Sequence, residues 1–152
     1  MDEHNDHQST PCIFCAIVQG AAPASRVYED ELVTAFMDIQ PVNPGHVLVI
    51  PNNHAADLSE LPGETGGRMF QVGQRIAAAL RRSGLRCEGV NFFLADGEAA
   101  GQEVFHVHLH VLPRYTGDGF GFVFGPHYRN RPERSALDDA AARIRQGLEE
   151  AV

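Results

Sequence analysis

Residues 105–115 read FHVHLHVLPRY, in which three histidines recur at alternate positions of an apolar run. Successive side chains of a β-strand point to opposite faces, so a strand would place His106, His108 and His110 together on one face. At about 3.3 Å per residue, neighbours in this row lie about 6.6 Å apart and the outer two about 13 Å. A zinc ion with bonds of about 2.0–2.1 Å to nitrogen would not reach all three. The pattern therefore predicts a row of histidines with different tasks.

Length, composition and charge bound the class of protein. The 152 residues fit one domain with a substantial core, and 43% of them are hydrophobic. No apolar run approaches the ~20 residues of a membrane span, and the acidic start MDEHNDHQST is unlike a secretory signal. The net charge of −8, from 12 basic and 20 acidic residues, argues against binding to nucleic acid but not against a local pocket for a small anion. We therefore expect a cytoplasmic protein without nucleic-acid or membrane partners, with a flexible acidic tail at 1–11 and a single domain at 12–152.

The remaining hydrophobic pattern of the sequence predicts a series of strands interrupted by two helices. β-Branched and aromatic residues predict strands at 27–30, 32–39, 46–51, 90–95 and 104–113. Apolar residues at helical spacing predict a helix within 67–84 that ends before Gly84, and a second helix that opens at Ser135. Because regular βαβ alternation is absent, the predicted fold class is α+β, a mainly antiparallel five-stranded sheet with two helices.

Two of the three cysteines form a Cys12-x-x-Cys15 pair in PCIFCAIV. In a reducing compartment this spacing suits metal or redox chemistry better than a structural disulfide. A thioredoxin-like redox motif would need a βαβ context, which the pattern lacks. Zinc binding is the favoured interpretation, and the alternative is a pair of reduced thiols that binds nothing.

The run HVHLHVL, starting at His106, resembles the His-φ-His-φ-His-φ-φ signature (φ, apolar) of the histidine triad family of nucleotide hydrolases and transferases. The resemblance extends through FMDIQPVNPGHVLVIPNNH and LADGEAAGQEVFHVHLHVLPRY and, with CIFCAIV, covers most of residues 12–115. It implies a histidine triad fold, a homodimer and attack on the α-phosphate of a nucleotide. The implied enzyme forms a nucleotidyl-histidine intermediate and releases a nucleoside monophosphate, expected to be AMP, from a phosphoramidate or a dinucleoside polyphosphate.

The resemblance also implies a role for each matching residue. His108 matches the middle histidine and would be the nucleophile, a task that suits imidazole because its ordinary pKa of about 6.5 leaves it largely neutral at pH 7. His110 and His46 would contact the phosphate, and Asp38 would accept hydrogen bonds from the ribose hydroxyls. The base pocket would be lined by Ile13, Phe14, Ile17, Phe36 and Ile39. Gly101, Gln102 and Val104 would complete the nucleotide site beside the phosphate.

Some bacterial members of the family bind zinc through a cysteine pair, a histidine that follows the VIP strand and the first triad histidine. The corresponding residues here are Cys12, Cys15, His54 and His106. Four nitrogen and sulfur ligands make a closed, structural site, at which a chelator would reduce stability alone. One departure from the family is Ala95, which stands where an amide side chain often contacts phosphate, and the neighbouring Asp96 accepts hydrogen bonds but cannot donate them when ionised.

Two alternatives to this hydrolase stay open on the sequence. One is a nucleotide-binding regulatory module with little turnover. The other treats the histidine row as an open catalytic metal site, whose activity would depend on a removable metal. The Gly/Phe-rich segment TGDGFGFVFG, residues 116–125, is typical of a mobile aromatic loop or a short strand pair, and in a dimer it could touch the leaving group.

Overall fold

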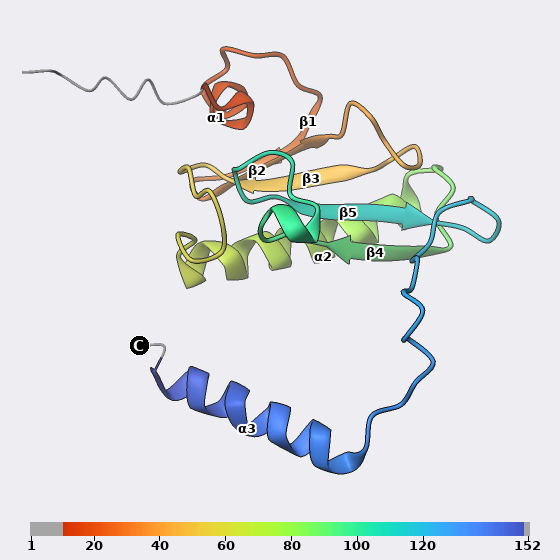
Figure 1. The fold of residues 1–152 in the computed structure, drawn as a ribbon. Coiled ribbons are helices and arrows are strands. Elements are labelled where there is room, and N and C mark those ends of the chain that lie inside the picture. The colour runs from red at the N-terminus through yellow and green to blue at the C-terminus, as the bar shows by residue number, and fades with distance from the viewer. Residues whose placement is uncertain (1–10, 151–152) are drawn as a thin grey trace, which may run out of the picture. The chain divides into compact units, whose positions relative to one another are not determined.

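The computed structural model describes residues 11–150, which divide into two compact units at the Gly119–Phe120 bond. Nearly all of the predicted acidic tail lies outside the described residues, and a single domain at 12–152 stays a prediction. Figure 1 labels the elements. The helices are α1 (Ile13–Val18), α2 (Gly63–Arg82) and α3 (Arg134–Glu150), with a short 3₁₀ turn at Glu98–Ala100. The strands are β1 (Arg26–Glu29), β2 (Val33–Met37), β3 (Val47–Pro51), β4 (Gly89–Phe93) and β5 (Leu109–Arg114).

The first unit is built on one five-stranded sheet in the order β1-β2-β3-β5-β4, with every neighbouring pair antiparallel. Val47, Leu48 and Val49 of β3 lie opposite Val111, His110 and Leu109 of β5. This register puts β5, the strand that carries the histidine run, next to the centre of the sheet. The predicted α+β class and the five-stranded antiparallel sheet are confirmed.

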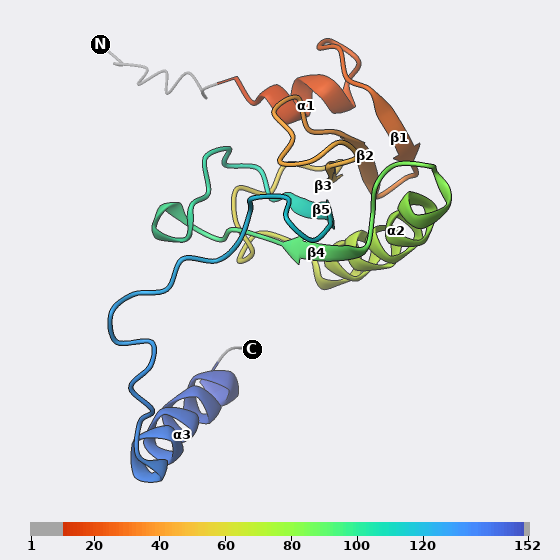
Figure 2. The same ribbon diagram turned by 90° about the vertical axis from the view of Figure 1, so that its right-hand side faces the viewer.

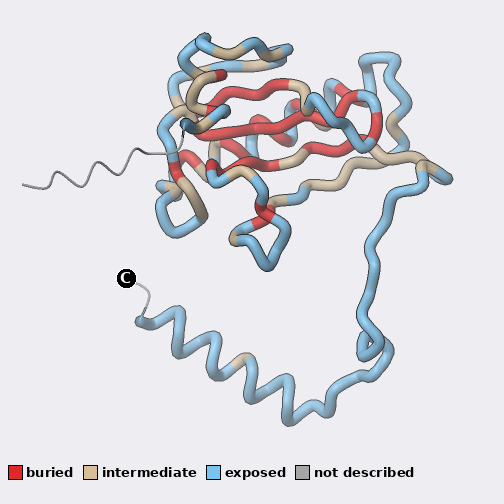
Figure 3. Tube along the Cα trace, turned by 45° about the horizontal axis from the view of Figure 1, so that its top comes forward, coloured by how far each residue is buried: buried red, intermediate tan, exposed pale blue. Residues whose placement is uncertain are grey.

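Helices α1 and α2 cover opposite faces of the sheet (Figures 1 and 2). The larger buried cluster joins α2 to one face and includes Val33, Ala35, Val47, Val49, Val107, Leu109 and Val111. The smaller cluster joins α1 to the other face and consists of Phe14, Ile17, Phe36, Leu48 and Ile50. Burial on both faces explains why the central strands are nearly continuous apolar runs and why most of their residues are buried (Figure 3).

Helix α2 is amphipathic, as its sequence predicts. Met69, Val72, Ile76 and Leu80 are buried against the sheet. Arg81 and Arg82 occupy the last turn, where cations complement the helix dipole. Gly84 follows with φ +82°, the left-handed conformation that commonly ends a helix. The helix begins at Gly63, four residues before the predicted segment, because Pro62 supplies an extended N-cap.

Two local predictions are corrected by the structure. A third, six-residue helix, α1, forms immediately after Cys12, whose sulfur accepts the N–H of Cys15 at 3.4 Å and caps the helix. The strand expected at 104–113 begins only at Leu109. The preceding residues bend away from the ladder because Val107 donates its N–H to the Ala55 carbonyl (2.8 Å) instead of to β3.

The second unit contains α3, which begins one residue before the predicted Ser135. None of its residues is buried, including the apolar stripe of Leu137, Ile144 and Leu148 (Figure 3). The Gly/Phe-rich segment forms no strand pair. Phe124 of that segment stacks on Tyr128 with ring centroids 3.8 Å apart. Among the described residues, no helix combines the length and apolar character needed to cross a membrane.

Candidate functional site

A cluster of two cysteines and two histidines lies where α1 meets the end of β3. The four members are Cys12, Cys15, His54 and His106, whose sulfur and nitrogen atoms all lie within 4.8 Å of one another. His106 is fully buried, and its Nε2–H donates to the Pro51 carbonyl at 2.8 Å. A carbonyl only accepts, so Nδ1 of His106 keeps its lone pair and faces the cysteines. The four predicted metal ligands are therefore brought together.

The distances inside this cluster fit a tetrahedral metal ion. Nδ1 of His106 lies 3.4 Å from Sγ of Cys12, 3.6 Å from Sγ of Cys15 and 3.2 Å from Nδ1 of His54. Sγ of Cys15 lies 3.4 Å from Nδ1 of His54. Tetrahedral zinc bonds imply edges of about 3.3 Å between two nitrogens and about 3.5 Å between nitrogen and sulfur. The donor set and its spacing therefore suit zinc.

Protonation in the cluster also fits a cation. Burial lowers the pKa of His106, and the neighbouring His54 and His108 lower it further, so its ring is neutral as a metal ligand must be. Burial and the adjacent Cys12 thiol raise the pKa of Cys15. Ionisation of Cys15 is therefore unfavourable unless a positive charge is present, and a bound metal would supply that charge.

His108 is held by a single hydrogen bond that fixes its tautomer. Its Nδ1 lies 2.8 Å from the backbone carbonyl of His106, which only accepts, so Nδ1 carries the proton. The Nε2 atom consequently has a free lone pair. Phe14 packs edge-on against the His108 ring with centroids 5.2 Å apart. The ring of His108 is therefore oriented by its Nδ1 bond, which leaves Nε2 without a protein hydrogen-bond partner among the described residues.

His46 and His110 form a directional hydrogen-bonded pair beside His108. The N–H of Val42 donates to Nδ1 of His46 at 3.1 Å, so the proton of this ring lies on Nε2. Nε2 of His46 then donates to Nδ1 of His110 at 2.8 Å. The second proton position of His110, Nε2–H, is left as a donor for a ligand. His108 and His110 are adjacent, with ring centroids 5.0 Å apart.

Burial keeps this pair neutral. It lowers the pKa of His46 and, together with the neighbouring His108 and His46, lowers the pKa of His110 to about 4. Asp38 opposes both shifts, and its Oδ2 lies 3.6 Å from Nε2 of His46. The other oxygen, Oδ1, accepts the N–H of Gln40 at 2.8 Å. At neutral pH the pair can therefore donate a hydrogen bond without carrying charge.

Asp38, His46 and His110 also lie close enough together to be considered as metal ligands. The 2.8 Å separation of the two ring nitrogens is a hydrogen-bond length, shorter than the ~3.3 Å edge of a tetrahedral zinc site. Nδ1 of His46 is already occupied by the Val42 N–H. The geometry favours a hydrogen-bond relay over a second metal site.

The expected base-pocket residues divide into two groups. Phe14, Ile17 and Phe36 are buried together in the α1 cluster, and the Phe14 and Phe36 rings meet edge-on at 5.5 Å. Ile13 and Ile39 are 52% and 99% exposed, so neither packs in that cluster. The structure thus brings three of the five together and leaves the other two at the surface.

The loop before the histidine run contains the remaining predicted nucleotide contacts. Gly101 adopts φ +91°, and Val104 packs at the edge of the α1 cluster. Gln102 is buried, and its amide donates to the carbonyls of Ala56 (2.7 Å) and Val104 (3.1 Å) while accepting the Gly97 N–H (2.8 Å). In this arrangement the Gln102 side chain braces the loop.

No side chain replaces the phosphate-contacting amide that the family often has at position 95. Ala95 is buried, and the neighbouring Asp96 accepts the N–H of Leu58 at 3.0 Å. The Asp96 carboxylate thus serves a backbone amide of another loop.

A buried polar network that sequence reasoning missed holds the loop before His46. Asp118 accepts from Nε and Nη2 of Arg114 at 2.6 and 2.9 Å, and from Nδ2 of Asn43 at 2.9 Å. Asn43 also donates to the Pro113 carbonyl at 2.9 Å, and its own carbonyl accepts the N–H of His46 at 3.1 Å. The signals were Asn43 in the NPGH stretch and Arg114 in the PRYTGD stretch, two polar residues to which sequence reasoning assigned no role.

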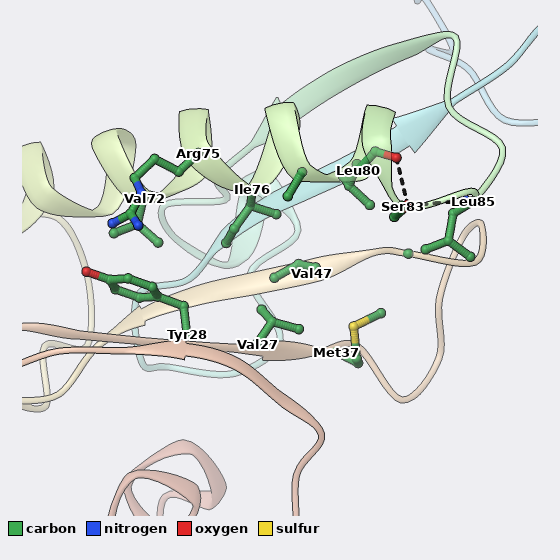
Figure 4. A pocket seen from close by; sticks show the side chains of 12 residues that line it. Val27, Tyr28, Met37, Val47, Val72, Arg75, Ile76, Leu80, Ser83 and Leu85 are labelled. Atoms are coloured by element: carbon green, nitrogen blue, oxygen red, sulfur yellow. Dashed lines mark hydrogen bonds between the residues drawn. The ribbon is translucent and has the colours of Figure 1, made fainter.

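A cavity of about 340 Å³ lies away from this chemistry, between α2 and strands β1 to β3 (Figure 4). Val72, Ile76 and Leu80 line it from α2, facing Val47 of the sheet. No histidine or cysteine lines this cavity. Ligand sites combine an apolar cavity with convergent polar groups, and here those groups lie on the opposite, α1-covered face.

Comparison with known proteins identifies this combination of fold and site. Residues 19–117 match the family model described as the HIT domain. An uncharacterized HIT-like protein of Mycobacterium tuberculosis is 47% identical over 126 residues, which cover 83% of this chain and 87% of the relative. A Zn-bound histidine triad family protein from Mycobacterium smegmatis superposes with a TM-score of 0.70 at 46% identity, covering 93% of this chain and 97% of that one. A histidine triad nucleotide-binding protein from Candida albicans gives 0.81 at 27% identity, covering 93% and 100%. The chain belongs to the histidine triad (HIT) family and has the histidine triad fold.

Proposed function

We propose that this protein is a nucleotide hydrolase that cleaves at the α-phosphate through a nucleotidyl-His108 intermediate. The observation that carries the proposal is the 2.8 Å hydrogen bond from Nδ1–H of His108 to the His106 carbonyl. It leaves the Nε2 lone pair free, so the nucleophile needs no separate base to activate it. Membership of a family with a nucleotide-binding relative supports a nucleotide as the substrate.

In the first step, Nε2 of His108 attacks the α-phosphorus and the bond from phosphorus to the leaving group breaks. An amine released from a phosphoramidate takes its proton from solvent, whereas a nucleotide released from a dinucleoside polyphosphate departs as an anion; the water of the second step returns a proton to solvent. In the second step, water attacks the same phosphorus, the phosphorus–nitrogen bond breaks and AMP is released. Nε2–H of His110 donates to a phosphoryl oxygen, and the His46 hydrogen bond holds that donor in place.

The rest of the nucleotide is held by residues on both sides of β3. Asp38 accepts hydrogen bonds from the ribose hydroxyls. Phe14, Ile17 and Phe36 form the inner wall of the base pocket, and Ile13 and Ile39 close over the base from the surface, where exposed apolar side chains gain from burial. Backbone N–H groups of the Gly101–Val104 loop, kept in place by Gln102, face the phosphate.

Cys12, Cys15, His54 and His106 hold zinc in this proposal. Bound zinc supplies a structural cross-link between α1 and the segment that contains the nucleophile. The similarity to a Zn-bound family member and the tetrahedral spacing of the four ligands support the site. The free thiols of the pair suit a reducing compartment, so the proposal places the protein in the cytoplasm.

A homodimer formed through the outer strand β4 is part of the proposal. One edge of β4 is unpaired in the sheet of the described chain. Phe93 of β4 and Phe70 of α2 are 47% and 53% exposed, and Phe70 packs on Phe92 with ring centroids 5.4 Å apart. Exposed aromatic residues beside an unpaired edge favour pairing with a second copy. Analytical ultracentrifugation tests this, with a dimer expected and a Phe93→Asp variant expected to dissociate.

The test of the function is AMP release from an adenosine phosphoramidate and from a dinucleoside polyphosphate, measured side by side. The native protein is expected to cleave at least one substrate, and the faster one identifies the leaving-group class. His108→Ala is expected to lose more than about 10³-fold in kcat while keeping its fold and its AMP affinity within a few-fold.

The second candidate function is a nucleotide-binding module with little turnover, favoured by Ala95 in place of a phosphate-contacting amide. It predicts that the native protein binds AMP but cleaves neither substrate. An open catalytic metal site instead predicts that a chelator abolishes activity. Added metal should then restore turnover in proportion to the amount of metal bound. A His108→Ala variant with native turnover would contradict the nucleophile directly.

A further inference from the structure

The nucleophile lies on a segment that the sheet does not hold. β5 begins at Leu109, and its ladder with β3 pairs only Val47 to Val49 with residues 109–111. Between the loop and the strand, the backbone donates one hydrogen bond to another segment, from Val107 to Ala55. Apart from this bond, the orientation of residues 106–108 depends on side-chain contacts.

His106 contributes to that orientation through three of its groups at once. Nε2–H donates to Pro51 at the end of β3, and Nδ1 faces Cys12, Cys15 and His54. Its backbone carbonyl accepts the Nδ1–H of His108 at 2.8 Å. A rotation of the His106 backbone would move the acceptor that selects the His108 tautomer.

A second link runs through α1. Cys12 caps this helix, and Cys15 lies in its first turn. Phe14, between the two cysteines, packs edge-on against both His106 (5.8 Å) and His108 (5.2 Å). Six residues are too few for a helix to be stable alone, so the position of Phe14 depends both on the packing of α1 against the sheet and on what anchors the two cysteines.

We propose that the metal centre of Cys12, Cys15, His54 and His106 sets the orientation and tautomer of His108, with His106 as the positioning residue. The inference rests on the proposed function and goes beyond a purely stabilising metal. The metal touches no reacting atom. It fixes the His106 carbonyl and the Phe14 ring, and these two contacts hold Nε2 of His108 in the direction of attack.

The experiment weakens the metal site without altering His106 or His108. His54→Ala and Cys15→Ser each remove one ligand, and His54 is exposed, so its removal leaves the core packing intact. Cys87→Ser is the matched control, because Cys87 is a thiol outside the cluster that interacts with the Gly89 carbonyl. Zinc content is measured in each protein, residual metal is removed with a chelator, and circular dichroism establishes the temperature range in which each variant is folded.

Two readouts are taken in that folded range. The first is the His108 tautomer at pH 8, from long-range proton–nitrogen correlations of ¹⁵N-histidine protein. We expect a single Nδ1–H form in the native protein and in Cys87→Ser, and a mixture with Nε2–H in the zinc-depleted variants. The second is turnover, where we expect kcat to fall about 10–100-fold with a much smaller change in KM.

An unchanged tautomer in a folded, zinc-depleted variant overturns the positioning role, whatever its turnover. A mixed tautomer together with a lowered kcat supports it. If the native protein cleaves neither substrate, the proposed function fails, while the tautomer readout still decides whether the metal centre orients His108.

Discussion

The histidines of residues 106–110 differ in chemistry because each ring makes a different hydrogen bond. His106 donates from Nε2 to a carbonyl, His108 donates from Nδ1 to another, and His110 accepts at Nδ1 from His46. The exposed lone pair is therefore on Nδ1 of the first and Nε2 of the second, while the third presents an N–H. In the proposed site, one residue type thus supplies a metal ligand, a nucleophile and a hydrogen-bond donor along a few residues of chain.

The half-buried donor His110 makes stability depend on pH. Its pKa is lowered to about 4 by burial and by the neighbouring His108 and His46, against an ordinary value of about 6.5. The unfolded chain therefore binds more protons between these values, so the free energy of unfolding falls as the pH drops from about 6.5 to about 4 and levels off below. Because the ring is only half-buried, we expect His110 to contribute about 1–2 kcal/mol to this fall.

Urea denaturation at several pH values measures this dependence. His110→Asn should flatten the curve between pH 4 and 6.5 but retain the part that comes from His46, whose pKa is also lowered. A variant curve as steep as the native one would show that His110 does not titrate in this way.

Gly45, in the turn before His46, cannot accept a side chain. Its φ is +101°, and a Cβ there would lie 3.0 Å from Leu80, 3.1 Å from Leu85 and 3.2 Å from Pro113. We expect Gly45→Ala to lower the free energy of unfolding by about 2–4 kcal/mol, through strain and overpacking. Gly67→Ala, in α2 with nothing within 4 Å, should instead stabilise by about 0.5–1 kcal/mol. Equal effects at both positions would contradict the packing around Gly45.

At the scale of elements, the loop before β3 is joined to β5 by Asp118. The Asp118 side chain is 3% exposed and raises the pKa of Arg114, which also donates to Asn91 of β4 at 2.6 Å. Asp118→Ala would leave the partly exposed Arg114 guanidinium without its buried carboxylate partner, and we expect it to lower the free energy of unfolding by more than the loss of an exposed ion pair does. Glu88→Ala, which removes an exposed contact of 3.8 Å to Arg86, should cost less than about 0.5 kcal/mol. Chemical denaturation compares the two, and similar losses would argue against a buried clamp.

Periodicity predicted the elements that are long or uniformly apolar. The four apolar residues of α2 and the five strands follow from spacing and β-branched content. Helix α1 escaped prediction because six residues have too little periodicity and the helix depends on a cysteine cap. The late start of β5 escaped because alternation continues through His106 and His108 although the backbone bonds elsewhere.

The sequence predicted which residues come together in the candidate site, because their types and motif spacing indicate the chemistry. The metal cluster and the histidine pair come together from residues chosen by motif. The protonation of each ring was not predictable, because it is set by the carbonyls of Pro51 and His106 and the N–H of Val42, and backbone groups leave no trace in the sequence. The role of Gln102 in bracing its loop depends on the same kind of contact.

At the scale of the whole molecule, the proposed metal centre of Cys12, Cys15, His54 and His106 links α1, the segment after β3 and the segment before β5. Removing metal with a chelator should lower the melting temperature by about 5–10 °C, since a ligand that binds only the folded state stabilises it. Added zinc should restore the native value. Identical melting curves before and after complete metal removal would contradict a structural site.

The measurement that tests the nucleophile most directly is a single turnover with substrate labelled at the α-phosphate, stopped in alkaline denaturant, which preserves phosphorus–nitrogen bonds. The account predicts that label appears on the protein before AMP accumulates, that peptide mapping places it on His108, and that His108→Ala carries none. AMP formed without labelled protein at any time point, or label at another residue, would contradict it.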